Sequence, residues 1–440
     1  MLRSLAFAAA LVLPSLALAG NGDAVPVSNE AALMGQAAVA NGTGAAAMYY
    51  NPALLGRLEQ SRADVTGSAF HLRISESQDL LIADDATIRV RNTEIVSIPS
   101  ALAYARPIGD DWRIGFGVFS PIAQDLELRV AETLVEGESE GSLRITLLDE
   151  TAVYVGVLSV ARRLQPGLWL GAALNGIYSQ SNQNYFQTGR LSDPTGSLVV
   201  GIEQQTELAF GGVSAQLGLT WEASPRVTLA GTITSPILAL AVVGSVRGVE
   251  GFGGGGTDGG GSSLEPFRVD LPPARVGPID GVGFRAGAEI RPTPALRLAL
   301  DGEVRTRMRN ADLGVDVDAF WNLRVGLEGR VAEEFWLAGG LFTDRQGNKG
   351  IEDFAVAQID FWGFTAGARW QTGYRLAEDE ERDRVTFGSV LAFRYAYGRG
   401  NVGGIRADLQ ATNDADALTL HLAELRQHEL GVHIGAWTAF

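Results

Sequence analysis

Histidine is the side chain best suited to acid–base or nucleophile-assisted chemistry, and it is scarce in this sequence. The four histidines are His71, His421, His428 and His433. Hydrolysis of a lipid ester would need a serine and a histidine within hydrogen-bond reach, with a third group to orient the imidazole. No sequence context assembles such a triad, and we expect His433, on an alternating C-terminal segment, to be an interior-facing polar residue. The sequence favours a protein that is not an enzyme.

Two further patterns could bind ligands. Gly251–Gly261 contains a formal G-x-G-x-x-G, but it lacks a strand-to-helix context and a Gly-Lys-Ser/Thr element, so we interpret it as a flexible loop. Glu136, Glu138 and Glu140 could hold Ca²⁺ loosely, although carboxylates two residues apart in a loop are usually only solvated. No metal site and no cofactor are predicted.

Composition excludes several classes of function. The 440 residues contain no cysteine, which excludes disulfides and thiolate chemistry. The net charge of −16 argues against a nucleic-acid partner, because binding to phosphates requires a basic face. Residues 1–19 read as a cleavable signal peptide, with Arg3, the apolar run Leu5–Leu18 and the small-residue site Ala17-Leu18-Ala19. This signal peptide predicts an exported bacterial protein. No later window is long and apolar enough for a transmembrane helix.

From Arg62 onward the dominant hydrophobic period is two, as in Trp321–Val331. In a soluble sandwich the apolar face would form the core. In an outer-membrane barrel it would face lipid, and the charged face would line the lumen. Aromatic residues favour the barrel: Trp362 and Trp370 share a face and would lie roughly 20 Å apart along the membrane normal, close to the height of the apolar band.

Connection lengths and the C-terminus also favour the barrel. Tight turns, expected in the periplasm, alternate with long polar connections, expected outside the cell. The long connections are placed near Glu76–Arg91, Ala131–Leu147, Arg190–Glu203, Arg247–Pro278, Asn310–Asp318, Arg345–Phe354 and Arg399–Leu425. Gly373–Arg384 is a longer turn that breaks this alternation. The last strand ends at Phe440, and a terminal aromatic resembles the signal read by the barrel-assembly machinery.

We predict an all-β fold, a fourteen-stranded antiparallel transmembrane β-barrel, for residues 61–440. The predicted strands are 62–74, 94–106, 112–130, 150–163, 167–188, 204–222, 226–246, 279–290, 294–309, 319–331, 334–345, 356–371, 384–398 and 427–440. Eight strands fill their interior with side chains, whereas 16 to 18 leave a water channel, so a barrel of this size should leak unless it is plugged.

Residues 20–60 are the segment available to plug the lumen, and we predict that they form a short helical hatch. Asn51 can cap a helix and Pro52 suits its first position, while Pro52 also ends any helix formed by Thr43–Tyr49. The hatch candidates are Gly42, Gly44, Tyr49, Tyr50, Asn51, Pro52 and Ala53.

Charged residues should crowd the lumen wall of strands 8 to 10. They could line a polar path or grip the hatch, but mutual neutralisation is the simpler role, because buried charges are normally paired. These residues are Arg285, Glu289, Arg297, Asp301, Glu303, Arg324, Glu328 and Arg330.

The segment MYYNPALLGRL followed by an alternating barrel resembles the FadL/TodX family of outer-membrane transporters for long-chain fatty acids and aromatic hydrocarbons. A second match, Ser100–Ala105 with Asp110–Pro121, resembles the family's second and third strands. The sequence departs from the family at Leu54 and at Ile122-Ala123, which affects the choice of substrate.

The resemblance implies passive uptake, with lateral exit of the cargo beside a kinked third strand. The residues that would form this gate are Gly115, Gly117, Phe119 and Pro121. Proline removes a ladder donor, so pairing should fail near Pro121, unless this residue only marks the protruding end of the strand.

We expect long-chain fatty acids to be the cargo, with aromatic hydrocarbons second. The expected partners are these hydrophobic molecules, outer-membrane lipid and lipopolysaccharide, and the assembly machinery, with the protein itself a monomer. A scaffold barrel that holds surface or secretion partners and transports nothing is the alternative from another class.

Overall fold

The computed structural model describes residues 25–83, 86–136, 139–193, 196–256, 262–270, 277–310, 315–347, 357–375, 384–407 and 418–440. The predicted signal peptide lies outside these residues. So do residues 20–24 of the predicted hatch, Glu138, part of Gly251–Gly261 and the acidic stretch 376–383.

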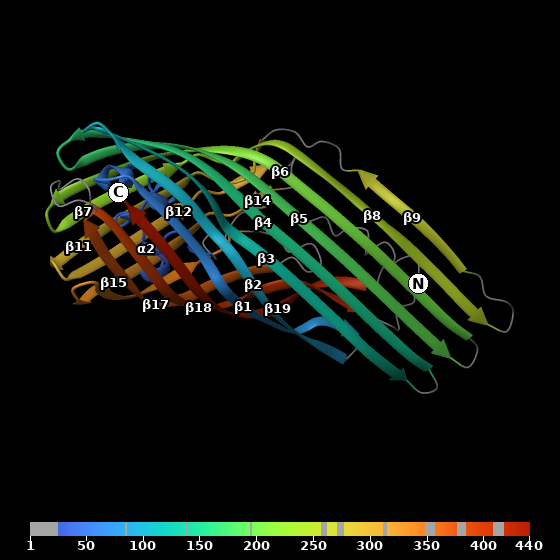
Figure 1. Ribbon diagram of the computed structural model, residues 1–440. Helices are drawn as coiled ribbons and strands as arrows, with labels where there is room; N and C mark the ends of the chain where they lie inside the picture. Colours follow the sequence, from blue (N-terminus) through green and yellow to red (C-terminus); the bar gives the residue numbers. More distant parts are fainter. Residues whose placement is uncertain are drawn as a thin grey trace.

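The described strands form a closed antiparallel barrel of 14 strands, as predicted (Figure 1). They are β1 (Arg62–Ala83), β2 (Ala86–Ile108), β3 (Trp112–Glu136), β4 (Ser139–Gln165), β5 (Leu168–Asp193), β6 (Gly196–Ser224), β7 (Val227–Thr234) continued by β8 (Leu238–Gly256), β11 (Gly283–Thr293), β12 (Leu296–Arg305), β15 (Phe320–Ala332), β16 (Phe335–Asp344), β17 (Ala357–Arg375), β18 (Arg384–Ala407) and β19 (Leu418–Ala439). Pairing of β19 with β1, from Arg62↔Ala439 onward, closes the ring.

Side chains are distributed as a lipid-facing barrel requires. On β15 the outward Trp321, Leu323 and Val325 are 44–51% exposed, whereas the inward Asn322 and Arg324 are each 2% exposed. This distribution is the reverse of a soluble core, and it places the oily faces of the strands outside. Trp362 and Trp370 also point outward, as the aromatic-belt interpretation predicts. No helix in the described ranges is long and apolar enough to cross a bilayer.

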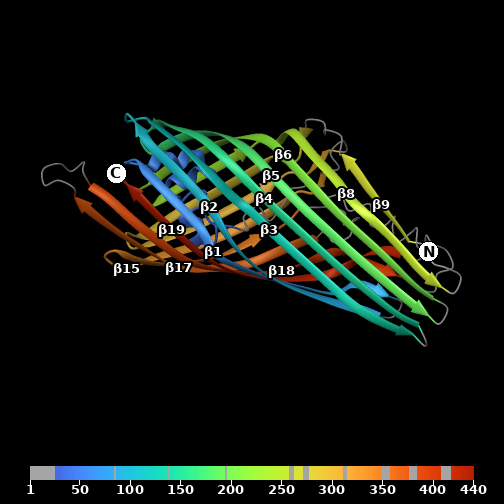
Figure 2. The ribbon, with the colours of Figure 1, turned by 45° about the vertical axis from the view of Figure 1, so that its right-hand side comes forward.

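The two ends of the barrel differ (Figure 2). At one, the short-turn end, most described connections are tight turns; at the other, the long-strand end, the strands project further from the barrel. At the short-turn end β2 and β3 are joined by residues 109–111, and β4 and β5 by residues 166–167. At the long-strand end several predicted loops are wrong, because β3 continues to Glu136, β4 begins at Ser139, and β5 and β6 stay paired out to Asp193↔Gly196. These polar, glycine-containing stretches still find ladder partners, so the strands extend past the predicted boundaries.

The described residues contain four further short strands, of which two belong to the barrel sheet and two form a sheet of their own. β9 (Ser262–Asp270) pairs with β8, and β10 (Gly277–Pro278) bridges to the start of β8. β13 (Met308–Asn310) and β14 (Val315–Val317) pair as a separate two-stranded sheet. β14 lies within the predicted connection Asn310–Asp318, whereas β13 begins in the predicted strand 294–309.

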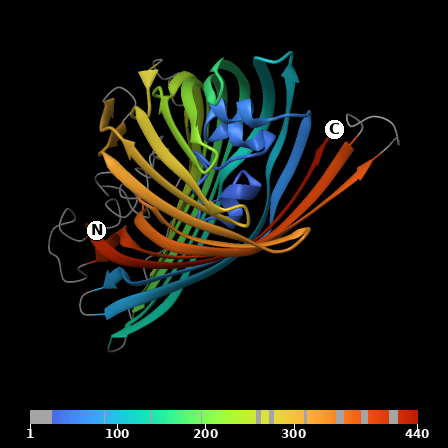
Figure 3. The same ribbon diagram turned by 90° about the vertical axis from the view of Figure 1, so that its left-hand side faces the viewer.

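The described part of the N-terminal segment, residues 25–60, lies inside the ring of strands (Figure 3). It contains α2 (Asn29–Leu33) and two 3₁₀ helices, η1 (Ala45–Tyr49) and η2 (Pro52–Arg57). The Asn51 side chain caps η2 by accepting a hydrogen bond from the backbone of Ala53, and Pro52 occupies the first turn, as predicted. The helix that starts at Pro52, and the end of the preceding helix before Pro52, are therefore confirmed.

Candidate functional site

Asn51 fixes the N-terminal segment to the barrel wall. It is completely buried, and its amide donates to the carbonyl of Val39 at 3.0 Å and to the Thr220 hydroxyl at 3.0 Å. Because Thr220 lies on β6, this one side chain connects the segment's own backbone to the barrel. Gln216, also on β6, donates to the carbonyl of Tyr50 at 2.9 Å.

Glycines on the wall allow the segment to approach this closely. A Cβ on Gly171 of β5 would lie 2.3 Å from the backbone nitrogen of Ala53, and one on Gly218 of β6 would lie 2.1 Å from Oδ1 of Asn51. Both distances are shorter than real contacts allow, so any side chain at either position would displace the segment. The predicted hatch residues Gly42 and Gly44 pack in the same way against Ala47 and against Asp64.

Charged groups of the barrel hold the segment by its backbone. Oδ2 of Asp301 accepts hydrogen bonds from Ala38 N at 2.5 Å and from Val39 N at 2.8 Å. Arg297 donates to the carbonyl of Asn41 at 3.2 Å, and Glu289 pairs with Arg57 at 2.7 Å. Barrel charges therefore contact the segment directly, although mutual neutralisation was the role that the sequence favoured.

Glu30 makes a contact within the N-terminal segment. The Thr43 hydroxyl donates to its carboxylate at 2.6 Å. Burial opposes ionisation of Glu30, but the Arg62 guanidinium and the Thr43 hydroxyl outweigh burial and hold the pKa of this carboxyl below its usual value. An ionised Glu30 therefore helps to fix the first part of the segment.

The other predicted lumen charges neutralise one another. Glu303 pairs with Arg285 at 3.0 Å and with Arg324 at 2.8 Å. Glu328 pairs with Arg297 at 2.6 Å and with Arg369 at 3.2 Å. Mutual pairing and gripping of the segment thus occur together.

Arg330 does not line the enclosed lumen, so the prediction that it is one of the lumen charges is wrong. Its side chain is exposed at the short-turn end, where it donates to the carbonyls of Ala332 and Glu333. The reason is its place on β15, close to the turn that begins after Ala332. The alternation continues to this residue, but the enclosed lumen does not.

The ladder between β2 and β3 ends about a third of the way along β3. The two strands pair from Ile108↔Trp112 to Ala101↔Phe119, and there the described pairing ends. The register between β3 and β4 also shifts, between Phe119 and Ile122. Beyond this point β3 stays paired with β4, and β2 stays paired with β1, but β2 and β3 are no longer paired with each other. The barrel wall therefore divides at Pro121.

The proposed gate residues have different roles at this break. Pro121 lies within β3 and does not mark its end, and its carbonyl accepts a hydrogen bond from Val25 N at 3.3 Å. Gly115 and Gly117 remain paired with both neighbouring strands, so they do not cause the break. Phe119 is completely buried, and its ring centroid lies 5.1 Å from that of Tyr49.

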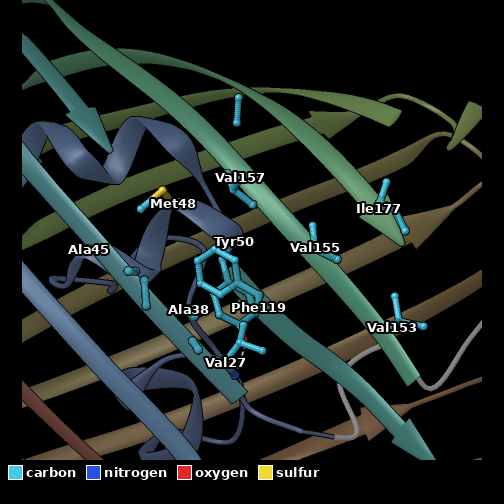
Figure 4. Close-up of a cluster of buried hydrophobic side chains, with 14 of the residues drawn as sticks. Val27, Ala38, Ala45, Met48, Tyr50, Phe119, Val153, Val155, Val157 and Ile177 are labelled. Atoms are coloured by element: carbon cyan, nitrogen blue, oxygen red, sulfur yellow. Dashed lines mark hydrogen bonds between the residues drawn. The ribbon is translucent and has the colours of Figure 1, made fainter. Parts of the chain in front are cut away.

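A cavity of about 110 Å³ lies in the lumen beside this break. Its apolar side is formed by Tyr49, Pro121, Ile122, Val153, Val155, Ile177 and Ile237, and its charged side includes Asp280, Arg285, Glu303, Arg305, Arg324 and Asp344. Figure 4 shows Val153, Val155 and Ile177 beyond Tyr50 and Phe119, away from the helices of the segment. The cavity therefore joins the N-terminal segment, the β3 break and the charged wall.

A second cavity, of about 400 Å³, lies at the short-turn end. Arg57, Glu222, Glu289 and Arg291 are among its lining residues, and Arg57 and Arg291 both pair with Glu289. This polar space suits water better than a hydrophobic ligand.

Sequence reasoning did not single out the apolar side of the central cavity. The sequence does contain a sign of this apolar side in Thr151–Val160, because this strand is apolar on both faces. One face of a barrel strand meets lipid, so apolar residues on the other face indicate an apolar patch in the lumen. Asp280 and Asp344 lacked such a signal, because they reach the cavity from strand ends.

These features define a barrel of the outer-membrane type that encloses its own N-terminal segment. No protein-family model matches the sequence, and no curated protein sequence matches it. Among solved structures, the chain is similar to a Pseudomonas aeruginosa FadL homologue, with a TM-score of 0.58 and 12% identity over 94% of this chain and 98% of that one.

Two toluene transporters have the same fold. TbuX of Ralstonia pickettii gives a TM-score of 0.53 at 14% identity, over 94% of this chain and 98% of that chain. TodX of P. putida gives 0.54 at 12% identity, over 93% and 98%. This chain thus has the fold of the FadL/TodX-like barrels, which confirms the predicted resemblance at the level of the fold.

Proposed function

We propose that the protein is a passive outer-membrane importer of hydrophobic compounds whose cargo leaves sideways between β2 and β3. The observation that supports this most strongly is the end of the β2–β3 ladder at Ala101↔Phe119, directly beside an apolar cavity that Pro121 and Ile122 line. In this proposal residues 25–60 seal the lumen against water. The fold shared with known transporters agrees with this role.

Lateral exit suits the physical properties of such cargo. Each CH₂ group gains about 0.8 kcal/mol on leaving water, so a route from the lumen straight into the bilayer avoids rehydrating the molecule. Passage down a gradient then needs no energy source.

The cavity bears on the choice of cargo. Its volume of about 110 Å³ is below the roughly 150 Å³ of an apolar cavity that binds benzene, so the cavity must widen slightly to hold even one ring. A long-chain fatty acid, the first expectation from sequence, would have to extend beyond it through the β2–β3 break. We therefore place ring-sized molecules ahead of long acyl chains.

Uptake measurements test this function. Removing the protein from its host should lower uptake of a labelled monoaromatic compound severalfold, and uptake of a labelled long-chain fatty acid less. Uptake of glycerol serves as the control and should not change. Normal uptake of both hydrophobic compounds, together with a stably co-purified protein, would favour the scaffold alternative.

A further inference from the structure

The charges that line the central cavity are balanced, and the choice of cargo that follows from this balance rests on the proposed function. Three arginines (Arg285, Arg305 and Arg324) face three acids (Asp280, Glu303 and Asp344). Glu303 lies between Arg285 at 3.0 Å and Arg324 at 2.8 Å, and Arg305 pairs with Asp280. The formal charge of this wall is therefore zero.

A carboxylate would be poorly accommodated in such a cavity. It would bring a charge into a space whose cations already have partners, and its desolvation would not be offset by a new ion pair. Glu303 is 4% exposed and Arg324 is 2% exposed, so solvent does little to screen them. A long-chain acid in its ionised form is thus disfavoured.

A pure hydrocarbon is also a poor match for the charged wall. Ionised carboxylates have about four lone-pair sites, and a guanidinium has five N–H groups, so paired side chains can still hydrogen-bond to an additional group. Covering them with hydrocarbon would remove water and supply no replacement. The opposite wall, with Val153, Val155 and Ile177, needs the apolar contact.

We propose that the cavity selects an uncharged amphiphile, a ring-sized apolar body with a neutral hydrogen-bonding end such as a hydroxyl or an amide. The apolar body lies against β3, β4 and β5, and the polar end meets the ion pairs of β11, β12 and β15. Both contacts are made within a single cavity.

Three ligands with the same carbon skeleton test this: 3-phenylpropan-1-ol, 3-phenylpropanoate and propylbenzene. Their affinities are measured at pH 8 on the detergent-purified full chain, by displacement of a fluorescent hydrophobic probe. The alcohol is expected to bind about tenfold more tightly than the acid and severalfold more tightly than the hydrocarbon. Equal or tighter binding of the acid or of the hydrocarbon overturns the inference alone. Failure of all three ligands to bind overturns the proposed function with it.

Charge variants make the test specific to this wall. Asp344→Asn and, independently, Asp280→Asn each leave a net positive charge in the cavity, and each should raise the affinity for 3-phenylpropanoate about tenfold relative to the alcohol. Asp316→Asn makes the same change on β14, where the carboxylate is 37% exposed and lies outside the cavity lining, and should leave the ratio unchanged. An unchanged ratio in both cavity variants contradicts the inference.

Discussion

Replacing Asn51 and Pro52 together by alanine is expected to make the barrel leak small hydrophilic solutes. The double variant removes the hydrogen bonds of Asn51 to Val39 and Thr220, the cap of η2, and the proline that fixes its first turn. Loss of such buried contacts costs about 2 kcal/mol, which raises the population of a displaced segment roughly 20- to 40-fold. Ion conductance across planar bilayers that contain the purified protein measures the leak.

The matched control is Asn401→Ala with Pro292→Ala, which makes the same two changes at exposed positions on β18 and β11. The control should keep the low conductance of the unmodified protein. If the double variant at Asn51 and Pro52 is as tight as the control, residues 25–60 do not form the seal.

Closing the β2–β3 break with a disulfide is expected to abolish uptake of hydrophobic cargo. Ser100 and Ser120 come directly after the last paired residues, Ala101 and Phe119, and both are buried. The chain has no cysteine, so Ser100→Cys with Ser120→Cys introduces a single possible pair. Uptake by oxidised cells should fall to the level of cells without the protein and return after reduction, because the bond joins the two halves of the wall.

Leu102→Cys with Val118→Cys provides the control for this disulfide. These two residues pair within the intact ladder and face outward, 60% and 55% exposed, so a bond between them leaves the break as it is. Oxidation of the control should not change uptake. Equal uptake by the oxidised and reduced forms of the Ser100/Ser120 variant would rule out this exit.

The barrel could be predicted because its determinants are local. The alternation of Trp321–Val331 identifies the lipid-facing side, and turns such as residues 166–167 are short enough to recognise. Strand ends were harder to predict. Stretches such as Arg190–Glu203 read as polar loops, but their described residues pair in β5 and β6 because each strand supplies the ladder partners of the other.

The site depended on contacts that no local pattern contains. Asp301 was predicted as a lumen charge, but its bond to Ala38 spans 263 residues. Pro121 indicated a break in the ladder, whereas the pairing of Gly115 and Gly117 could be seen only once β2 and β4 were in register. Arg330 lies outside the enclosed lumen because it stands close to the turn after Ala332, and the alternating pattern does not mark where the enclosed lumen ends.

Photolabelling of the purified protein with a diazirine-bearing aromatic alcohol, followed by peptide mapping, locates the bound cargo. Labelling that excess unlabelled alcohol suppresses should fall on the cavity residues Pro121, Ile122, Val153 and Val155. Suppressible labelling confined to outward residues such as Leu341 and Val243 would contradict a cargo site within the barrel.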